Sequence, residues 1–100
     1  MALHIIEHND GLEVSGNLTF DNMGFLKRTI EHKMSQNEFF TVSLDKLDSI
    51  DPQCAKTLER LFQKVVRENK ALKIIGLENE SIMPAMRATN TSYILCDDRV

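Results

Sequence analysis

Stretches with the periodicity of β-strands alternate with stretches that have the periodicity of α-helices, and this alternation constrains the fold more than any other feature. Apolar residues recur at every second position in Phe39–Asp45 and form short apolar runs in the other strand-like stretches, whereas they recur at every third or fourth position in the helix-like stretches. The predicted order is β-β-α-β-α-β-α-β, without repeats, low-complexity tracts or linkers. Strands separated by helices need crossover connections, so the pattern predicts an α/β fold with a mixed, mostly parallel sheet.

The beginning of the chain is predicted to form an antiparallel hairpin and a helix. Strands are expected at Leu3–His8 and at Leu12–Gly16, because an Asp-Gly turn between apolar runs is a strong hairpin signal. Thr19 is expected to cap a helix that runs from Phe20 to about Met34. The core face of this helix is predicted from five residues at helical spacing: Phe20, Met23, Leu26, Ile30 and Met34.

The middle of the chain is predicted to form a central strand and a second helix. The alternating segment Phe39–Asp45 is expected to be the strand. Asp51 is a good N-cap and Pro52 falls at the first helical position, so the helix is expected to begin there and to end near Asn69. Its buried face is predicted from a second set at helical spacing: Ala55, Leu58, Leu61, Phe62 and Val65.

The end of the chain is predicted to add two strands with a helix between them. The strands are expected at Leu72–Leu77 and at Tyr93–Cys96. A third helix is expected to follow Ser81 as its cap and to end near Asn90, since Pro84 is tolerated in a first helical turn.

Length and composition limit the protein to one domain, predicted at residues 1–100. One hundred residues with 42% hydrophobic composition suit a single core. No apolar run is long enough to cross a membrane and the first ten residues do not resemble a signal peptide, so we expect a soluble, cytoplasmic protein without direct membrane insertion. The net charge of -3 argues against broad electrostatic binding to nucleic acid.

The segment from Phe40 to Leu58, FTVSLDKLDSIDPQCAKTL, resembles the STAS domain family. In that family a strand that ends in Asp or Asn leads through a short loop to Asp-Ser-Ser/Thr-Gly-Leu, which opens the second helix. Asp45 and Asp51 match the two acids, and the resemblance implies that both belong to the partner-binding surface. Gly16 also lies where the family places such a residue. The resemblance extends to the order of elements along the whole chain, and it implies a STAS-like single domain.

The resemblance implies a regulatory function but not the family's usual phosphorylation switch. In anti-sigma-factor antagonists of this family, a partner kinase phosphorylates the hydroxyl of the second residue after the motif aspartate. Here Pro52 and Gln53 follow Asp51 and neither has a hydroxyl, so no phosphorylation is expected at either residue. Ser49 and Thr57 are alternative hydroxyls nearby.

Two kinds of partner are compatible with such a domain. The first is an anti-sigma kinase-like regulator, in which case the chain is a non-enzymatic regulatory or adaptor domain that acts by protein-protein docking. The alternative is an accessory STAS subunit of a membrane transport system, such as a lipid-transport ABC complex or a sulfate-type transporter. Nucleotide binding in the loop before the second helix is a third hypothesis, taken from the wider family.

A row of polar residues on the second helix is the predicted partner-binding surface. Helical spacing places Gln53, Lys56, Arg60, Lys64 and Arg67 opposite the apolar face, as a basic ridge that continues from Asp51 and Pro52. The alternative interpretation is an ordinary solvated helix face.

Phe25 is a second candidate for partner binding. It lies off the apolar face of the first helix, so it is a candidate anchor for a partner or for a second copy of the chain in a homodimer. The alternative is that a loop near Asn17 folds over it.

Enzymatic, metal and cofactor functions find little support in the sequence. It contains no glycine-rich phosphate loop, HExxH motif or nucleophile elbow, so we predict no catalytic residues, no metal and no cofactor. His4 and His8 would be roughly 13 Å apart along a strand, too far to share one ion. Cys54, near a helix start, is predicted to be a buried core thiol rather than a redox sensor, and Cys96 is interpreted in the same way.

Overall fold

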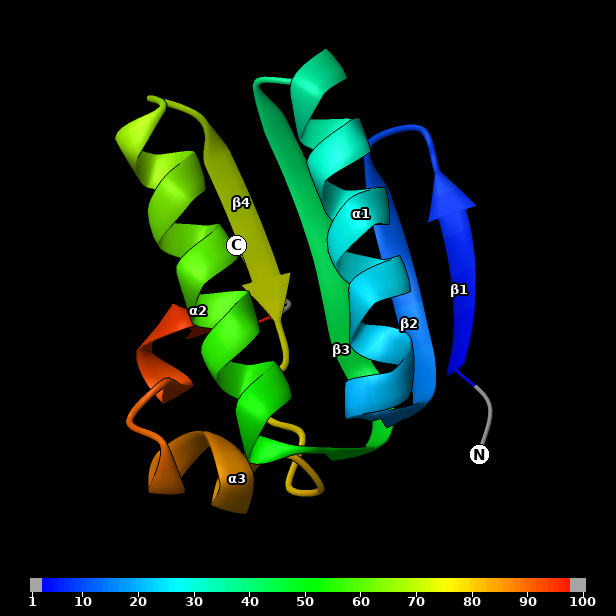
Figure 1. The fold of residues 1–100 in the computed structure, drawn as a ribbon, viewed down its shortest axis with the longest axis vertical. Helices are drawn as coiled ribbons and strands as arrows, with labels where there is room; N and C mark the ends of the chain where they lie inside the picture. The colour runs from blue at the N-terminus through cyan, green and yellow to red at the C-terminus, as the bar shows by residue number, and fades with distance from the viewer. Residues whose placement is uncertain (1–2, 98–100) are drawn as a thin grey trace.

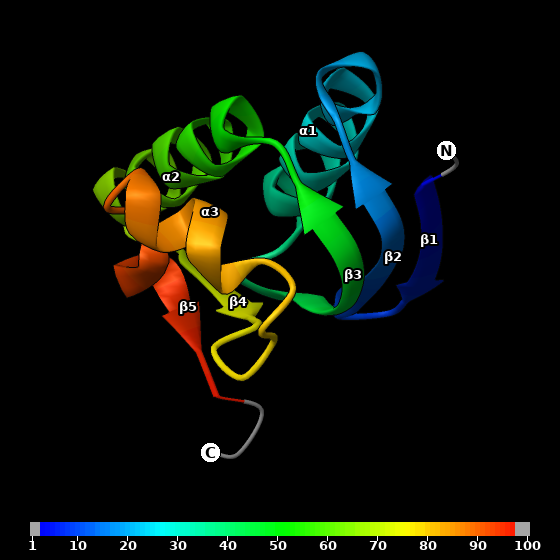
Figure 2. The same ribbon diagram turned by 90° about the horizontal axis from the view of Figure 1, so that it is seen from below.

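The computed structural model describes residues 3–97, which form a five-stranded sheet with all helices on one face (Figures 1 and 2). The strands lie side by side in chain order: β1 (Leu3–His8), β2 (Gly11–Leu18), β3 (Phe39–Ile50), β4 (Ala71–Ile75) and β5 (Leu95–Cys96). β1 is antiparallel to β2, and every other neighbouring pair is parallel. The predicted α/β fold with a mostly parallel sheet, an opening hairpin and β3 at its centre is therefore confirmed.

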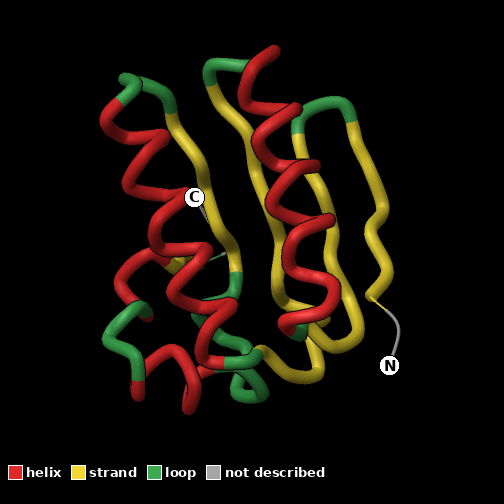
Figure 3. The backbone as a smooth tube through the Cα atoms, viewed as in Figure 1, coloured by secondary structure: helices red, strands yellow, loops and turns green. Residues whose placement is uncertain are grey.

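The helices connect successive parallel strands. α1 (Phe20–Gln36) joins β2 to β3 and α2 (Pro52–Arg67) joins β3 to β4, while the short α3 (Met83–Ala88) and a 3₁₀ turn, η1 (Ser92–Ile94), precede β5. α1 and α2 both begin at the end of the sheet where β2 and β3 finish (Figure 3). α2 stops where expected, because Asn69 adopts a left-handed conformation (φ 61°) that ends the helix.

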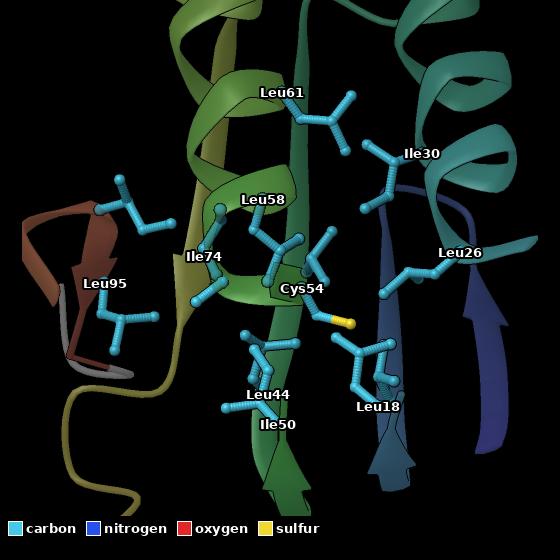
Figure 4. Packing of buried hydrophobic residues seen from close by; sticks show 14 of the residues in the cluster. Leu18, Leu26, Ile30, Leu44, Ile50, Cys54, Leu58, Leu61, Ile74 and Leu95 are labelled. Carbon is cyan, nitrogen blue, oxygen red and sulfur yellow. The ribbon is translucent and has the colours of Figure 1, made fainter. Parts of the chain in front are cut away.

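One apolar core lies between the sheet and the helices (Figure 4). Leu26 and Ile30 of α1 and Leu58 of α2 are completely buried, and each such side chain contributes about 1.5–3 kcal/mol of transfer free energy. The sheet supplies the other side of the core with alternate residues of its strands: Leu12, Val14, Leu18, Phe40, Val42, Leu44, Leu72 and Ile74. Because alternate strand residues point to opposite faces, this core leaves the second face of the sheet uncovered by helices (Figure 2).

The prediction that β3 ends at Asp45 is wrong. The strand continues to Ile50 because β2 reaches Leu18 and pairs with it, with Asn17 opposite Ser49 and Leu18 opposite Ile50. Two irregularities in this pairing shift the register, so the simple alternation seen before residue 45 does not persist after it. Asp45 and Asp48 thus lie on a strand and not in a loop.

The last third of the chain also departs from the prediction. α3 follows Ile82 and not Ser81, whose backbone N–H instead donates to Asn79 Oδ1 (2.9 Å) in the preceding turn. β4 stops at Ile75, and the final strand contains only Leu95 and Cys96 because the two residues before them form η1. Short apolar runs have no clear period, so the sequence pattern predicted both strands to be longer at one end than they are in the structure.

Phe20 was expected in the core and is instead 79% exposed. It is the first residue of α1, and its helical position relative to Met23 and Ile30 places it at the edge of the apolar stripe, where the core does not cover it. The other four residues predicted for this face, from Met23 to Met34, are buried.

Two glycines of β2 are required by the backbone. Gly16 has φ 95° at the second irregularity between β2 and β3, a conformation that L-residues rarely adopt. Gly11 packs so closely on β3 that a Cβ atom would lie 2.8 Å from the carbonyl oxygen of Thr41. Both positions fix how β2 lies against its parallel neighbour.

Candidate functional site

Asp51 joins the starts of the two long helices. Its backbone N–H donates to Leu18 O (3.0 Å), and its carboxylate Oδ2 accepts from the backbone N–H of Phe20 (3.2 Å). Its carbonyl accepts the backbone N–H of Cys54 (2.9 Å), which begins α2. Asp51 is therefore at the predicted N-cap position of α2, but its carboxylate satisfies a free donor of α1.

A short polar network fixes the start of α1 beside this junction. Asn22 Oδ1 accepts from the Thr19 N–H (2.8 Å), and Asn22 Nδ2 donates to Asn17 O (2.9 Å). Ser49 Oγ donates to Asn17 Oδ1 (2.5 Å) from the neighbouring strand. The connections β2–α1 and β3–α2 are thus tied together, which sets the spacing between the two helices above them.

A groove of about 640 Å³ runs between α1 and α2. Met23, Cys54 and Leu61 form its apolar floor, and Figure 4 shows Leu61 pointing toward Ile30 of α1 across the helix interface. Phe20 stands at one end. Four basic residues line the groove, of which one comes from α1 and three from α2: Lys27, Arg60, Lys64 and Arg67.

The positive charge of this groove is not compensated within the described part of the chain. Lys27, Lys64 and Arg67 have no acidic partner among residues 3–97, and Arg60 donates only to Thr57 Oγ1 (3.4 Å). Glu31 alone among the lining residues is acidic. The local excess of cations contrasts with the net charge of -3 for the whole chain.

A second hollow of about 380 Å³ continues the groove toward the C-terminal ends of the two helices. The two hollows share Glu31, Leu61 and Lys64, so they adjoin at these residues and together make up the depression between α1 and α2. At its far end Lys70 Nζ donates to the Met34 carbonyl (2.6 Å) and thereby satisfies a free acceptor near the end of α1.

The structure divides the predicted basic ridge into two parts. Gln53, Arg60, Lys64 and Arg67 line the groove, whereas Lys56 is exposed on α2 but does not line it. Pro52 is exposed at the first position of α2, as predicted from the sequence. The ridge is therefore one wall of a groove whose other wall is α1.

The two remaining predicted residues lie away from the groove. Asp45 lies two residues after Ser43 on β3 and lines a shallow depression over the strands with His8 and Lys46. Asp45 and Asp51 are six residues apart along a strand, roughly 20 Å, so they do not form one site. Phe25 is 58% exposed, which shows that the alternative of a covering loop is wrong, and it does not line the groove.

Sequence reasoning missed the α1 wall of the groove. Lys27, Glu31 and Gly24 are spaced along one side of the buried stripe of α1, which is a signal that the helical wheel contains. A helical wheel does not indicate which flank of a helix faces a neighbouring helix. That information comes from the structure, in which α1 and α2 lie side by side (Figure 1).

Cys54 is not a reactive thiol. It is 1% exposed, and burial, with a further contribution from the Asp51 charge, raises its pKa to about 11. It is thus a protonated core residue, as predicted. Cys96 is only partly buried, in contrast to the prediction, although burial also raises its pKa.

Within residues 3–97 no three His, Cys, Asp or Glu side chains are grouped so that they could hold a metal ion. No helix in the same range combines the length and the apolar character that a membrane crossing needs.

Comparisons with known proteins place this geometry in a known fold. The family model described as the STAS domain matches residues 4–98. A solved structure of the anti-sigma factor antagonist SpoIIAA in its unphosphorylated form is similar, with a TM-score of 0.72 and 8% sequence identity, and the match covers 96% of this chain and 87% of that one. A comparison with curated protein sequences finds no match.

Proposed function

This chain belongs to the STAS domain family, and from that premise we propose that it is a non-enzymatic regulatory or adaptor domain that acts by docking with a protein partner. The contact surface would be centred on the start of α2, with Asp51, Pro52 and Gln53, and would extend along the exposed residues Lys56, Arg60 and Lys64. The observation that carries the proposal is the unpaired row of cations beside a rigid helix start.

The geometry of the junction supports a docking function rather than chemistry. Hydrogen bonds through Asp51 hold the starts of α1 and α2 in one arrangement, so a partner would meet a preformed surface and little ordering entropy would be lost on binding. Unpaired cations beside an apolar floor add electrostatic attraction and directional selectivity for an acidic partner.

Control of this docking would not follow the antagonists' phosphorylation switch at the start of α2. Gln53 stands at the position where the family motif has a hydroxyl, and its amide cannot accept a phosphate. Of the nearby hydroxyls, Ser49 Oγ donates a hydrogen bond to Asn17 Oδ1, and Thr57 Oγ1 donates one to the Gln53 carbonyl (3.1 Å). We propose that binding is constitutive or is controlled by the partner.

Affinity purification of the tagged chain from its native host after gentle cross-linking, followed by reconstitution with each purified partner, tests this proposal. We expect a protein that binds the purified chain directly and that loses affinity when Lys56, Arg60 and Lys64 are all changed to Glu. A triple variant that folds and binds the partner as tightly as the wild type would contradict the proposed surface. A kinase-like regulator would place the chain in a partner-switching pathway, and transporter or ABC subunits would identify an accessory domain.

Self-association is a separate outcome of the same experiment. Phe25 is exposed on the side of α1 away from the groove, where a second copy or a further partner could bury it. Sedimentation of the wild type and of Phe25→Ala distinguishes a homodimer from a monomer, since only a dimer anchored by Phe25 would dissociate.

A further inference from the structure

We propose that the groove between α1 and α2 binds an acidic amphipathic helix supplied by the protein partner. This inference rests on the proposed docking function and specifies both the surface and its occupant. It moves the contact from a ridge on α2 to a depression that α1 and α2 form together, and it thereby includes Lys27 and leaves Lys56 outside.

The shape of the depression fits a helix. Its lining on α1 extends from Phe20 to Ser35 and on α2 from Gln53 to Glu68, which in each case is roughly 22 Å at the helical rise of 1.5 Å per residue. A partner helix of about four turns has the same length. Binding of an amphipathic helix in a groove between two others is a general mode of recognition that uses anchors at helical spacing.

The chemistry of the groove specifies an occupant with one apolar stripe and acids beside it. Met23 and Leu61 supply an apolar floor, and the exposed ring of Phe20 gives a large apolar contact at one end. Arg60, Lys64 and Arg67 follow one another at spacings of four and three residues on α2. A partner helix with Glu or Asp at the same spacing would place one acid opposite each cation.

The charges also define an orientation across the groove. The α2 wall carries three cations, with Glu68 only at its far end, whereas the α1 wall has Lys27 and, one turn later, Glu31. The acidic row of the occupant therefore faces α2, and the side that faces Glu31 is neutral or basic.

A recessed site favours a helix over an anionic membrane surface. Binding to an anionic bilayer requires a strongly basic protein face, whereas these exposed cations flank a recessed apolar floor in a chain with net charge -3. Membrane binding is tested below as the competing outcome.

The probe for the test is a fluorescein-labelled 14-residue peptide with Leu at helical spacing and with Glu at positions that match Arg60, Lys64 and Arg67. A second peptide has Lys in place of each Glu and keeps the same apolar face. We expect fluorescence anisotropy to show binding of the acidic peptide alone, weakened by salt. Backbone amide shifts in NMR spectra should change along the facing sides of α1 and α2.

Matched variants locate the peptide. Lys64→Glu, inside the groove, should weaken binding about tenfold or more, whereas Lys56→Glu, exposed on the same helix but outside the groove, should change it less than about twofold. Gly24→Trp should block the groove without disturbing the core, because a Cβ at this position has only Arg28 Nη1 nearby, at 3.4 Å.

Three results would overturn the inference. They are absence of binding by the acidic peptide, equal losses in Lys64→Glu and Lys56→Glu, and stronger salt-sensitive binding to phosphatidylglycerol vesicles than to the peptide. A native partner that binds the chain with an affinity unaffected by Gly24→Trp would refute the groove as the binding site and would leave the proposed docking function intact. Absence of any direct partner would refute the docking function itself.

Discussion

The two faces of the sheet carry charge in opposite ways. On the open face, Glu13 of β2 contacts His8 of β1 (2.9 Å) and Lys46 of β3 (3.9 Å), so this acid has a polar partner on each neighbouring strand. On the helical face, the α1–α2 groove gathers like charges with no acidic partner among residues 3–97. Mixed, paired charges suit a solvated surface, whereas unpaired like charges beside an apolar floor destabilise the free chain and favour a binding function.

The largest contrast between the two faces should be in stability. Leu44 and Ser43 are neighbours on β3, but Leu44 is completely buried under the helices and Ser43 points to the open face. Leu44→Ala should lower the free energy of unfolding by about 2–5 kcal/mol, while Ser43→Ala should change it by less than about 0.5 kcal/mol. Urea unfolding followed by circular dichroism measures both, and similar losses would show that the open face is covered.

Two glycines test the difference between the interior of the sheet and the wall of the groove. Gly11→Ala should destabilise the protein by about 1–3 kcal/mol because the new Cβ would meet the Thr41 carbonyl oxygen at 2.8 Å. Gly24→Ala should stabilise it by about 0.5–1 kcal/mol, since an alanine in an exposed helix lowers the entropy cost of folding. Thermal melts of both variants check the opposite signs, and a loss of stability in Gly24→Ala would mean that the groove wall is packed.

The junction at Asp51 links both helices of the groove to the sheet. Asp51→Ala should cost about 1 kcal/mol, because the Phe20 N–H loses its acceptor at the start of α1. Asp48→Ala is the control, since Asp48 is exposed on the preceding strand and should have little effect. Hydrogen exchange should become faster in the first turn of α1 in the Asp51 variant only, and an unchanged rate there would contradict the link.

The smallest effect concerns the unpaired charge itself. Lys64 has Arg60 four residues before it and Arg67 three residues after it, so Lys64→Glu replaces two repulsions by two attractions. Glu68, four residues after it, and the last-turn position offset part of this gain, so the variant should stabilise the free chain by less than about 0.5 kcal/mol while it weakens partner binding. Lys56→Glu should leave stability almost unchanged, because the new glutamate would be repelled by Glu59, three residues later, and attracted by Arg60, four residues later. Urea titrations at low salt and at 1 M salt measure this difference, which should vanish at high salt. A destabilised Lys64→Glu would mean that the lysine has a structural partner.

The candidate site was predicted from the sequence only in part. Asp51, Pro52, Gln53, Arg60 and Lys64 could be proposed from the sequence because a helix start and a helical face are local patterns. Lys27 and Phe20 were missed, although they are as exposed as the residues on α2. Their significance depends on a contact between two helices that are separated by a whole strand, and no local pattern encodes such a contact.

Local periodicity and turn chemistry by themselves determined the type and order of the elements, the opening hairpin and, apart from the exposed Phe20 and the half-buried Phe62, the buried faces of α1 and α2. These features depend on residues close together in the sequence, where hydrogen bonding and side-chain direction follow fixed rules. The tertiary structure alone decided how far β3 extends, that the Asp51 carboxylate serves α1 and not its own helix, and that the basic ridge is one wall of a groove. Each of these is set by packing between segments that are distant in the chain, and that packing determines which exposed groups are available to a partner.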